Sequence, residues 1–149
     1  MNVFQLNLIE IPLSQRTKNS NIKKNIQEEG KKIIAKIPKD TLVIALDEHG
    51  EQWSSTELAT RFRAWQIAWK NMSIIIGGPD GLSEECLKKA SLKWSLSKLT
   101  FPHQLVRVIL IEQLHRAWSI LNNHPYHREH IKKYSFCDSA KSSIRNDGV

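Results

Sequence analysis

The stretch TLVIAL, residues 41–46, decides the fold of this chain of 149 residues. Only its first residue is polar, and such a run is typical of a β-strand that is covered on both faces. The stretch MSIII, residues 72–76, has nearly the same character. We therefore expect parallel strands in one sheet, with helices packed on both sides of it.

Helical and extended patterns alternate around these two strands. In residues 4–11 and 92–97 apolar and polar residues alternate, as they do in β-strands. The order of elements is then β-α-β-α-β-α-β-α, which predicts an α/β layered sheet of four strands. Ser54 and Glu57 form a capping box, and Ser83 precedes two glutamates that suit a helix start. The predicted helices cover residues 22–37, with a break expected at Gly30, then a segment after Ser54, a short one after Ser83, and residues 104–122.

Length and composition predict a single globular domain. Hydrophobic residues make up 40% of the chain and charged residues 25%, which suffices for one core. We assign the domain to residues 1–133 and expect the polar tail, residues 134–149, to be disordered. The start resembles no signal peptide, and Arg107 and Glu112 interrupt the longest apolar stretch, so no membrane span and a cytoplasmic location are expected.

The net charge narrows the class of partner. There are 22 Lys and Arg residues against 15 Asp and Glu residues, a formal charge of +7. This balance favours polyanions such as nucleic acid, although a basic surface alone also fits a protein that binds none.

The last predicted helix carries more apolar residues than one core face requires. Two explanations remain open at this point: a homodimer seam, or a central helix in a large core. The residues concerned are Val106, Val108, Ile109, Leu110, Ile111, Leu114, Trp118, Ile120 and Leu121.

Three loops are candidates for a ligand site because ligands of open α/β sheets bind at the carboxyl ends of the strands. They are residues 46–47, residues 77–81 and residues 97–103. The second, within IIIGGPDG, has neither the lysine of a P-loop nor the glycine spacing of a dinucleotide fold. It is either an ordinary turn or a backbone bare enough for close approach of a ligand.

The histidines near the C-terminus invite a metal hypothesis. His124, His127 and His130 are three residues apart, but Pro125 interrupts a helix and no cysteine completes the ligand set, so we expect no metal. The alternative is a segment that faces RNA, with Tyr126 stacking on a base. A nucleophilic triad of Ser97, His103 and Asp80 is disfavoured because the chain has no G-x-S-x-G elbow.

Three segments together resemble a known family. IIIGGPDGLS, SLSKLTFPHQLVRVILIEQLHRAWSI and NHPYHRE look like the ribosomal RNA large subunit methyltransferases H of the SPOUT superfamily, with the resemblance running over residues 4–129. It implies an α/β domain with a C-terminal trefoil knot. It also implies a homodimer that transfers a methyl group from S-adenosylmethionine to N3 of a pseudouridine in 23S rRNA, on assembled ribosomes.

The resemblance also implies roles for individual residues. His103 and Arg116 would surround the target base, together with Tyr126, His127 and Arg128 from the tail of the partner chain. Either His103 or His127 would take the proton from N3, and the choice stays open. The cofactor would contact Leu46, Gly77, Leu96, Ser97, Lys98, Leu99, Thr100 and Phe101.

This chain departs from the family pattern at both ends. Family members begin with an additional strand and helix before the segment that matches residues 4–11, so the resemblance implies an N-terminally shortened chain. Polar residues also continue past the PYHR motif. The alternative function is therefore a non-catalytic remnant of the family that binds RNA or the ribosome.

Overall fold

A three-stranded parallel sheet lies at the centre of the computed structural model, which describes residues 4–127. Strand β1 (Thr41–Glu51) is in the middle, between β2 (Asn71–Ile76) and β3 (Leu92–Trp94), and both neighbours run parallel to it. The expected α/β class with parallel strands is confirmed. The described part of the chain has no helix that is long and apolar enough to cross a membrane.

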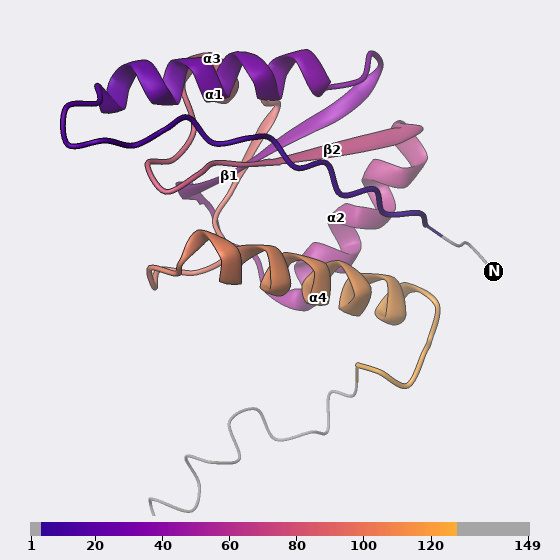
Figure 1. Ribbon diagram of the computed structural model, residues 1–149. Coiled ribbons are helices and arrows are strands. Elements are labelled where there is room, and N and C mark those ends of the chain that lie inside the picture. The colour runs from indigo at the N-terminus through magenta and orange to yellow at the C-terminus, as the bar shows by residue number, and fades with distance from the viewer. Residues whose placement is uncertain (1–3, 128–149) are drawn as a thin grey trace, which may run out of the picture.

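Helices cover both faces of the sheet, as the sequence predicts (Figure 1). Helices α1 (Ile22–Lys36) and α3 (Glu84–Lys89) lie on one face. Helices α2 (Ser55–Ala68) and α4 (His103–Leu121) lie on the other. The predicted bounds of the first and last helices agree with these to within one residue, and α2 and α3 begin directly after Ser54 and Ser83 as expected.

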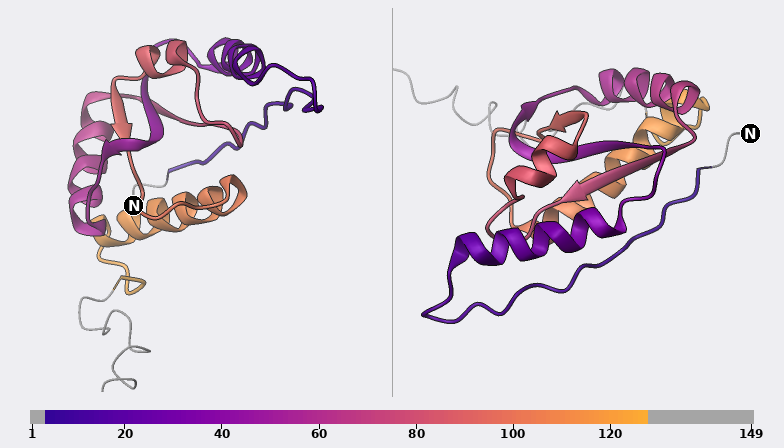
Figure 2. Two further views of the ribbon diagram at one scale, coloured as in Figure 1. Left: turned by 90° about the vertical axis from the view of Figure 1, so that its left-hand side faces the viewer. Right: turned by 90° about the horizontal axis from the view of Figure 1, so that it is seen from above.

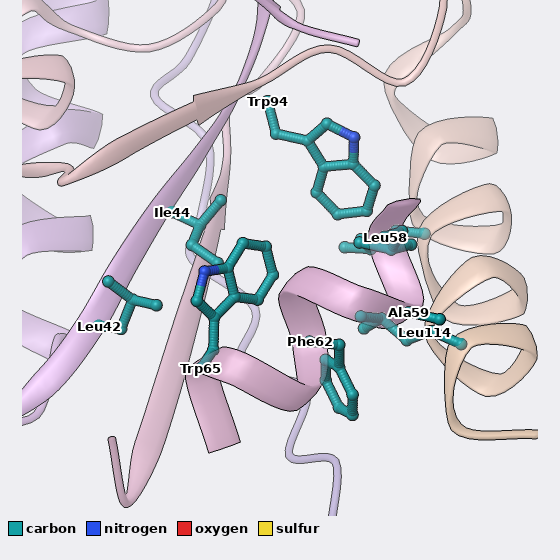
Figure 3. Packing of buried hydrophobic residues seen from close by; sticks show 10 residues of the cluster. Leu42, Ile44, Leu58, Ala59, Phe62, Trp65, Trp94 and Leu114 are labelled. Atoms are coloured by element: carbon teal, nitrogen blue, oxygen red, sulfur yellow. The ribbon is translucent and has the colours of Figure 1, made fainter. Parts of the chain in front are cut away.

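Alternate side chains of β1 supply the two cores. Leu42 and Ile44 pack with Phe62 and Trp65 of α2 (Figure 3), and Leu114 of α4 belongs to the same cluster. Val43 and Ala45, which point to the opposite face, pack with Cys86 of α3 and with isoleucines of α1. Each of these four β1 residues is at most 5% exposed, so the strand is buried on both sides.

Local capping fixes where the helices begin. The Ser54 hydroxyl accepts the Glu57 amide at 3.1 Å, and the Glu57 carboxylate accepts the Ser54 amide at 2.7 Å, which completes the predicted capping box. Ser83 accepts the Cys86 amide at 3.2 Å and caps α3. These two predictions from the sequence are confirmed.

One of the four expected strands is absent, and another is shorter than predicted. Residues 4–11 form no strand because no neighbouring strand pairs with them in the described chain, and Leu6, Leu8 and Ile9 are about half exposed. The strand expected at residues 92–97 is β3, and it ends at Trp94. The next amide, that of Ser95, donates a hydrogen bond to the Glu51 carbonyl at 2.8 Å. The sheet therefore has three strands instead of four.

Residues 4–21, here called the N-terminal strap, run past the sheet and α1 and then turn at residues 17–20 before α1 begins (Figure 2). The Phe4 ring packs edge-on against Phe62 of α2, with centroids 5.7 Å apart. Glu10 accepts a charged hydrogen bond from Arg107 of α4 at 2.9 Å. Side-chain contacts thus hold the strap where strand pairing was expected.

Helix α1 is continuous through Gly30, so the expected break is wrong. A Cβ atom at this position would lie 2.2 Å from the Ser83 hydroxyl oxygen and 2.9 Å from its Cβ. Glycine is required because α1 and the start of α3 approach closely there, and the contact compensates for its poor helix propensity.

We expect Gly30→Ala to lower the free energy of unfolding by about 1–2 kcal/mol, because overpacking costs about 1–3 kcal/mol while alanine returns up to about 1 kcal/mol of helix propensity. Urea denaturation measures the change. Lys31→Ala, at an exposed neighbouring position, is the control and should stay within about 0.5 kcal/mol of wild type. A stabilised Gly30→Ala variant would contradict the close contact.

Candidate functional site

A cavity of about 650 Å³ opens at the carboxyl edge of the sheet. This volume is in the range of sites for small molecules and cofactors. Its walls come from the end of β1, from the loop after β2 and from the loop between β3 and α4. The lining residues are Leu46, Asp47, Glu48, His49, Ile76, Gly77, Gly78, Pro79, Asp80, Gly81, Leu82, Trp94, Ser95, Leu96, Ser97, Lys98, Leu99, Thr100, Phe101, Pro102, His103 and Val106.

The loop after β2, residues 77–82 and here called the glycine loop, is a tight turn. The Gly81 amide donates to the Gly78 carbonyl at 3.0 Å, and Gly81 has a φ of +85°, a conformation that favours glycine. A Cβ atom at Gly77 would lie 2.4 Å from the Gly81 carbonyl carbon. The turn itself therefore requires glycine at residue 77, independently of any ligand.

The loop between β3 and α4 is braced by its own serines. The Ser95 hydroxyl donates to the Ser97 carbonyl at 3.0 Å, and the Ser97 hydroxyl accepts the Leu99 amide at 3.0 Å. Leu99 is 71% exposed, whereas Leu96 and Phe101 are half-buried at the cavity wall. The loop thus offers apolar side chains and main-chain groups to the same cavity.

The predicted cofactor residues all border this cavity. Sequence reasoning selected three strand-end loops, and the fold brings them together with His103 at the start of α4. The residues brought together are Leu46, Gly77, Leu96, Ser97, Lys98, Leu99, Thr100, Phe101 and His103.

Sequence reasoning missed part of the cavity wall. Strand β1 continues past the predicted end to Glu51 and brings Glu48 and His49 to the cavity beside Asp47, which the sequence had already indicated. The pairing of β1 with β3 is irregular between Leu46 and Glu51. Gly50 was the available signal, because a Cβ atom there would lie 2.6 Å from the backbone of β3.

A second polar group gathers near the C-terminal end of α4. This C-terminal cluster consists of Glu112, Arg116, Tyr126 and His127. Arg116 donates to Glu112 Oε1 through Nε at 2.9 Å and through Nη2 at 2.6 Å, and the Tyr126 hydroxyl donates to the same oxygen at 3.2 Å. Arg116 Nη1 also lies 3.1 Å from His127 Nδ1. Glu112 therefore orients the cluster, beyond stabilising the helix.

Rings pack beside this cluster. His115 lies edge-on to Tyr126 with centroids 4.5 Å apart, and it stacks on Trp118 at 5.8 Å. The exposed Tyr126 ring also lies 5.1 Å from the Arg116 guanidinium. A cation and flat aromatic faces are the groups that bind phosphates and unstacked bases.

The predicted base-side residues do not meet within one chain. His103 begins α4 at the cavity, and Arg116 lies 13 residues further along the same helix, about 20 Å away at 1.5 Å per residue. Tyr126 and His127 fold back onto Arg116, away from His103. Arg128 lies outside the described residues.

The metal hypothesis gains no support from this region. Among residues 4–127 no group of three or more His, Cys, Asp or Glu side chains is placed to hold a metal ion. His124 packs against His115 and Trp118, while His130 is outside the described part of the chain.

The chain is similar to a family of methyltransferases over most of its length. The sequence model of a family described as predicted SPOUT methyltransferase matches residues 1–127. The chain is 49% identical over 125 residues to the ribosomal RNA large subunit methyltransferase H of Marinomonas sp. (strain MWYL1), covering 84% of this chain and 81% of that protein. It is 51% identical over 124 residues to the same enzyme of Thioalkalivibrio sulfidiphilus (strain HL-EbGR7), covering 83% and 80%.

We expect Gly77→Ala to destabilise the fold by about 2–3 kcal/mol, because its methyl group would overlap turn backbone that cannot rotate away. Chemical denaturation measures the loss. Gly81→Ala is the comparison: it meets open space and only carries the strain of a positive φ, about 1–2 kcal/mol.

Asparagine separates the two causes, since it tolerates positive φ better than alanine. Gly81→Asn should cost less than Gly81→Ala, whereas Gly77→Asn should cost more than Gly77→Ala. The same order at both positions would contradict the distinction.

Proposed function

This chain belongs to the SPOUT methyltransferase family, and from that membership we propose that it transfers a methyl group from S-adenosylmethionine to N3 of a pseudouridine in 23S rRNA on assembled ribosomes. The observation that carries the proposal is the convergence of all three strand-end loops on one cavity of nucleoside size. The names of the two relatives, both ribosomal RNA large subunit methyltransferases H, support the rRNA substrate.

The cavity fits the cofactor that the family implies. Leu46, Leu96 and Phe101 offer apolar surface to a flat ring, and Gly77 and Gly78 of the glycine loop border the same cavity. Leu46, Gly77 and residues 96–101 would hold the cofactor, which supplies an electrophilic methyl group when bound. In a displacement of this kind the protein chiefly aligns the reactants and excludes water.

The base-side residues act on the RNA. A uridine-like N3 bears a proton that must leave, and an imidazole is the side chain suited to exchange protons near neutral pH. His103 lies at the cavity wall, whereas His127 lies beside the Arg116 guanidinium in the C-terminal cluster. Arg116, Tyr126 and Arg128 would bind phosphate and base, which suits the net positive charge of the chain.

A homodimer would bring His103 at the cavity of one chain close to the C-terminal cluster of the other. Leu105, Val108 and Ile111 of α4 are 44%, 63% and 41% exposed and recur every three residues on one side of the helix. An apolar stripe of this kind suits a self-complementary interface. The C-terminal cluster of one chain would then lie beside the cavity of the other.

The domain and its topology complete the proposal. We propose that residues 1–133 act as one methyltransferase domain and that its C-terminal half is threaded into a trefoil knot, as the family implies.

Two measurements test the function. Calorimetry with S-adenosylhomocysteine, a stable product of the reaction, tests the cofactor site. Mass spectrometry of rRNA after incubation with assembled ribosomes and S-adenosylmethionine tests transfer and locates the modified base. Cofactor binding together with RNA binding but without methylation would indicate the non-catalytic remnant instead.

Replacing His103 and His127 with Ala tests the proton-transfer role. We expect the double variant to lose about 100-fold or more in methyl transfer, the usual range for general acid–base groups, while its affinity for S-adenosylhomocysteine falls far less. The two single variants show which histidine acts. Lys31→Ala, at an exposed position of α1 outside the cavity, is the control. Unchanged turnover in the double variant would refute the role.

We expect Val108→Asp to make the chain monomeric, because a carboxylate would be buried at the centre of the apolar stripe on α4. Light scattering during size-exclusion chromatography measures the mass. Ile67→Asp, at a residue of α2 that is 79% exposed, is the matched control and should leave the mass unchanged. A wild-type monomer at micromolar concentration would contradict the interface.

A further inference from the structure

Arg16 of the N-terminal strap bridges two carboxylates that come from distant parts of the chain. Its Nε donates to Asp80 Oδ2 of the glycine loop at 2.9 Å. Its Nη1 lies 3.0 Å from Glu29 Oε1 of α1, and its Nη2 donates to Glu29 Oε2 at 3.3 Å. One planar guanidinium thus links α1 to the loop that walls the cavity, in a geometry that lysine cannot reproduce.

The α1 end of this bridge is firmly held. The Glu29 side chain is only 5% exposed, and its Oε1 also accepts the Ser14 amide at 3.1 Å. Arg16 Nη1 also donates a hydrogen bond to the Ser14 carbonyl at 3.2 Å. The guanidinium is therefore oriented by the helix and the strap, and Asp80 is the partner on the less constrained element.

The bridge lies behind the glycine loop as seen from the cavity. A Cβ atom at Gly78 would lie 3.0 Å from Leu13, 3.3 Å from Glu29 Oε2 and 3.7 Å from Arg16 Nη2. Gly78 and Asp80 also line the cavity, whereas Arg16 and Glu29 do not. The loop is thus packed between the strap and the cavity, so a change at Arg16 reaches the ligand only through the loop.

The charge on Arg16 persists at every working pH. Hydrogen bonds to Asp80, and to a lesser extent to Glu29, raise the pKa of Arg16 above its ordinary value. A raised pKa of a cation contributes stability below the unfolded value and loses it only above the folded value, so this contact does not titrate near neutrality. Arg16 and Asp80 remain 28% and 27% exposed, so salt screens the pair and its contribution to global stability is small.

We infer that Arg16 is a positioning residue for the cofactor site: it fixes the glycine loop from behind through Asp80, so that ligand affinity depends on a strap residue that never touches the ligand. The nature of the ligand rests on the proposed function. The positioning of the loop stands on the contacts of Arg16 alone.

The test compares Arg16→Gln, Asp80→Asn and the double variant with wild type. Hydrogen exchange of the backbone amides of Gly78, Asp80, Gly81 and Leu82, without ligand, reports the order of the loop. Calorimetry with S-adenosylhomocysteine reports affinity. We expect each single variant to exchange faster at the loop and to bind about fivefold more weakly, the effect of a partly exposed charge pair of about 1 kcal/mol. The double variant should bind no more weakly than Arg16→Gln alone, since the Asp80 side chain has already lost its partner in that variant.

The control is Glu10→Gln, which breaks the other ion pair of the strap, with Arg107, and touches neither the glycine loop nor the cavity. It should leave loop exchange and affinity unchanged. In a methyl transfer assay Arg16→Gln should raise KM for S-adenosylmethionine and keep kcat, and Arg16→Lys should be intermediate, because one ammonium group cannot hold both carboxylates in the same way.

The outcomes separate this inference from the proposed function. Unchanged loop exchange in Arg16→Gln overturns the inference, and so does unchanged affinity when wild type binds the ligand. An equal loss of affinity in Glu10→Gln also overturns it, because the effect would then belong to the strap as a whole. If wild type binds no S-adenosylhomocysteine, the proposed cofactor fails, while faster exchange in Arg16→Gln still supports the positioning of the loop.

Discussion

The burial of β1 on both faces is the constraint on which the rest of the structure depends. Leu42 and Ile44 require α2 and α4 on one side, and Val43 and Ala45 require α1 and α3 on the other. Strands that flank such a strand are reached through helices and run parallel to it. The carboxyl ends of all three strands therefore meet at one edge, and the loops that follow them enclose the cavity.

The parts of the fold that sequence predicts are those set by neighbouring residues. The run at residues 41–46 already shows a strand buried on both faces, and the capping box at Ser54 and Glu57 marks the start of α2. The predictions of a strand at residues 4–11 and of a helix break at Gly30 were wrong because residues distant in the sequence decide the structure there. An alternating pattern forms a strand only beside a partner strand, and the need for glycine at residue 30 comes from Ser83, 53 positions away.

For the candidate site, too, some features could be predicted from the sequence and others could not. Its location was predictable, because loops after parallel strands converge wherever the sheet is formed. Its finer contacts were not, since the extension of β1 to His49 depends on β3, and the pairing of Arg16 with Asp80 joins residues that are 64 positions apart. Asp80 reads in sequence as an ordinary turn residue. In the fold it is the point at which the glycine loop is held from outside the cavity.

Helix α4 connects the two groups of candidate residues and also keeps them apart. It is one unbroken helix of 19 residues, with His103 at the cavity and Arg116 near the far end. Leu110, Leu114 and Ala117 are buried in the core that α4 shares with α2, so bending the helix would unpack that core. A rigid helix cannot bring both of its ends to one nucleobase. Under the proposed function, the two groups reach one base if they come from two chains, and the exposed stripe on α4 is the surface through which such chains would pair.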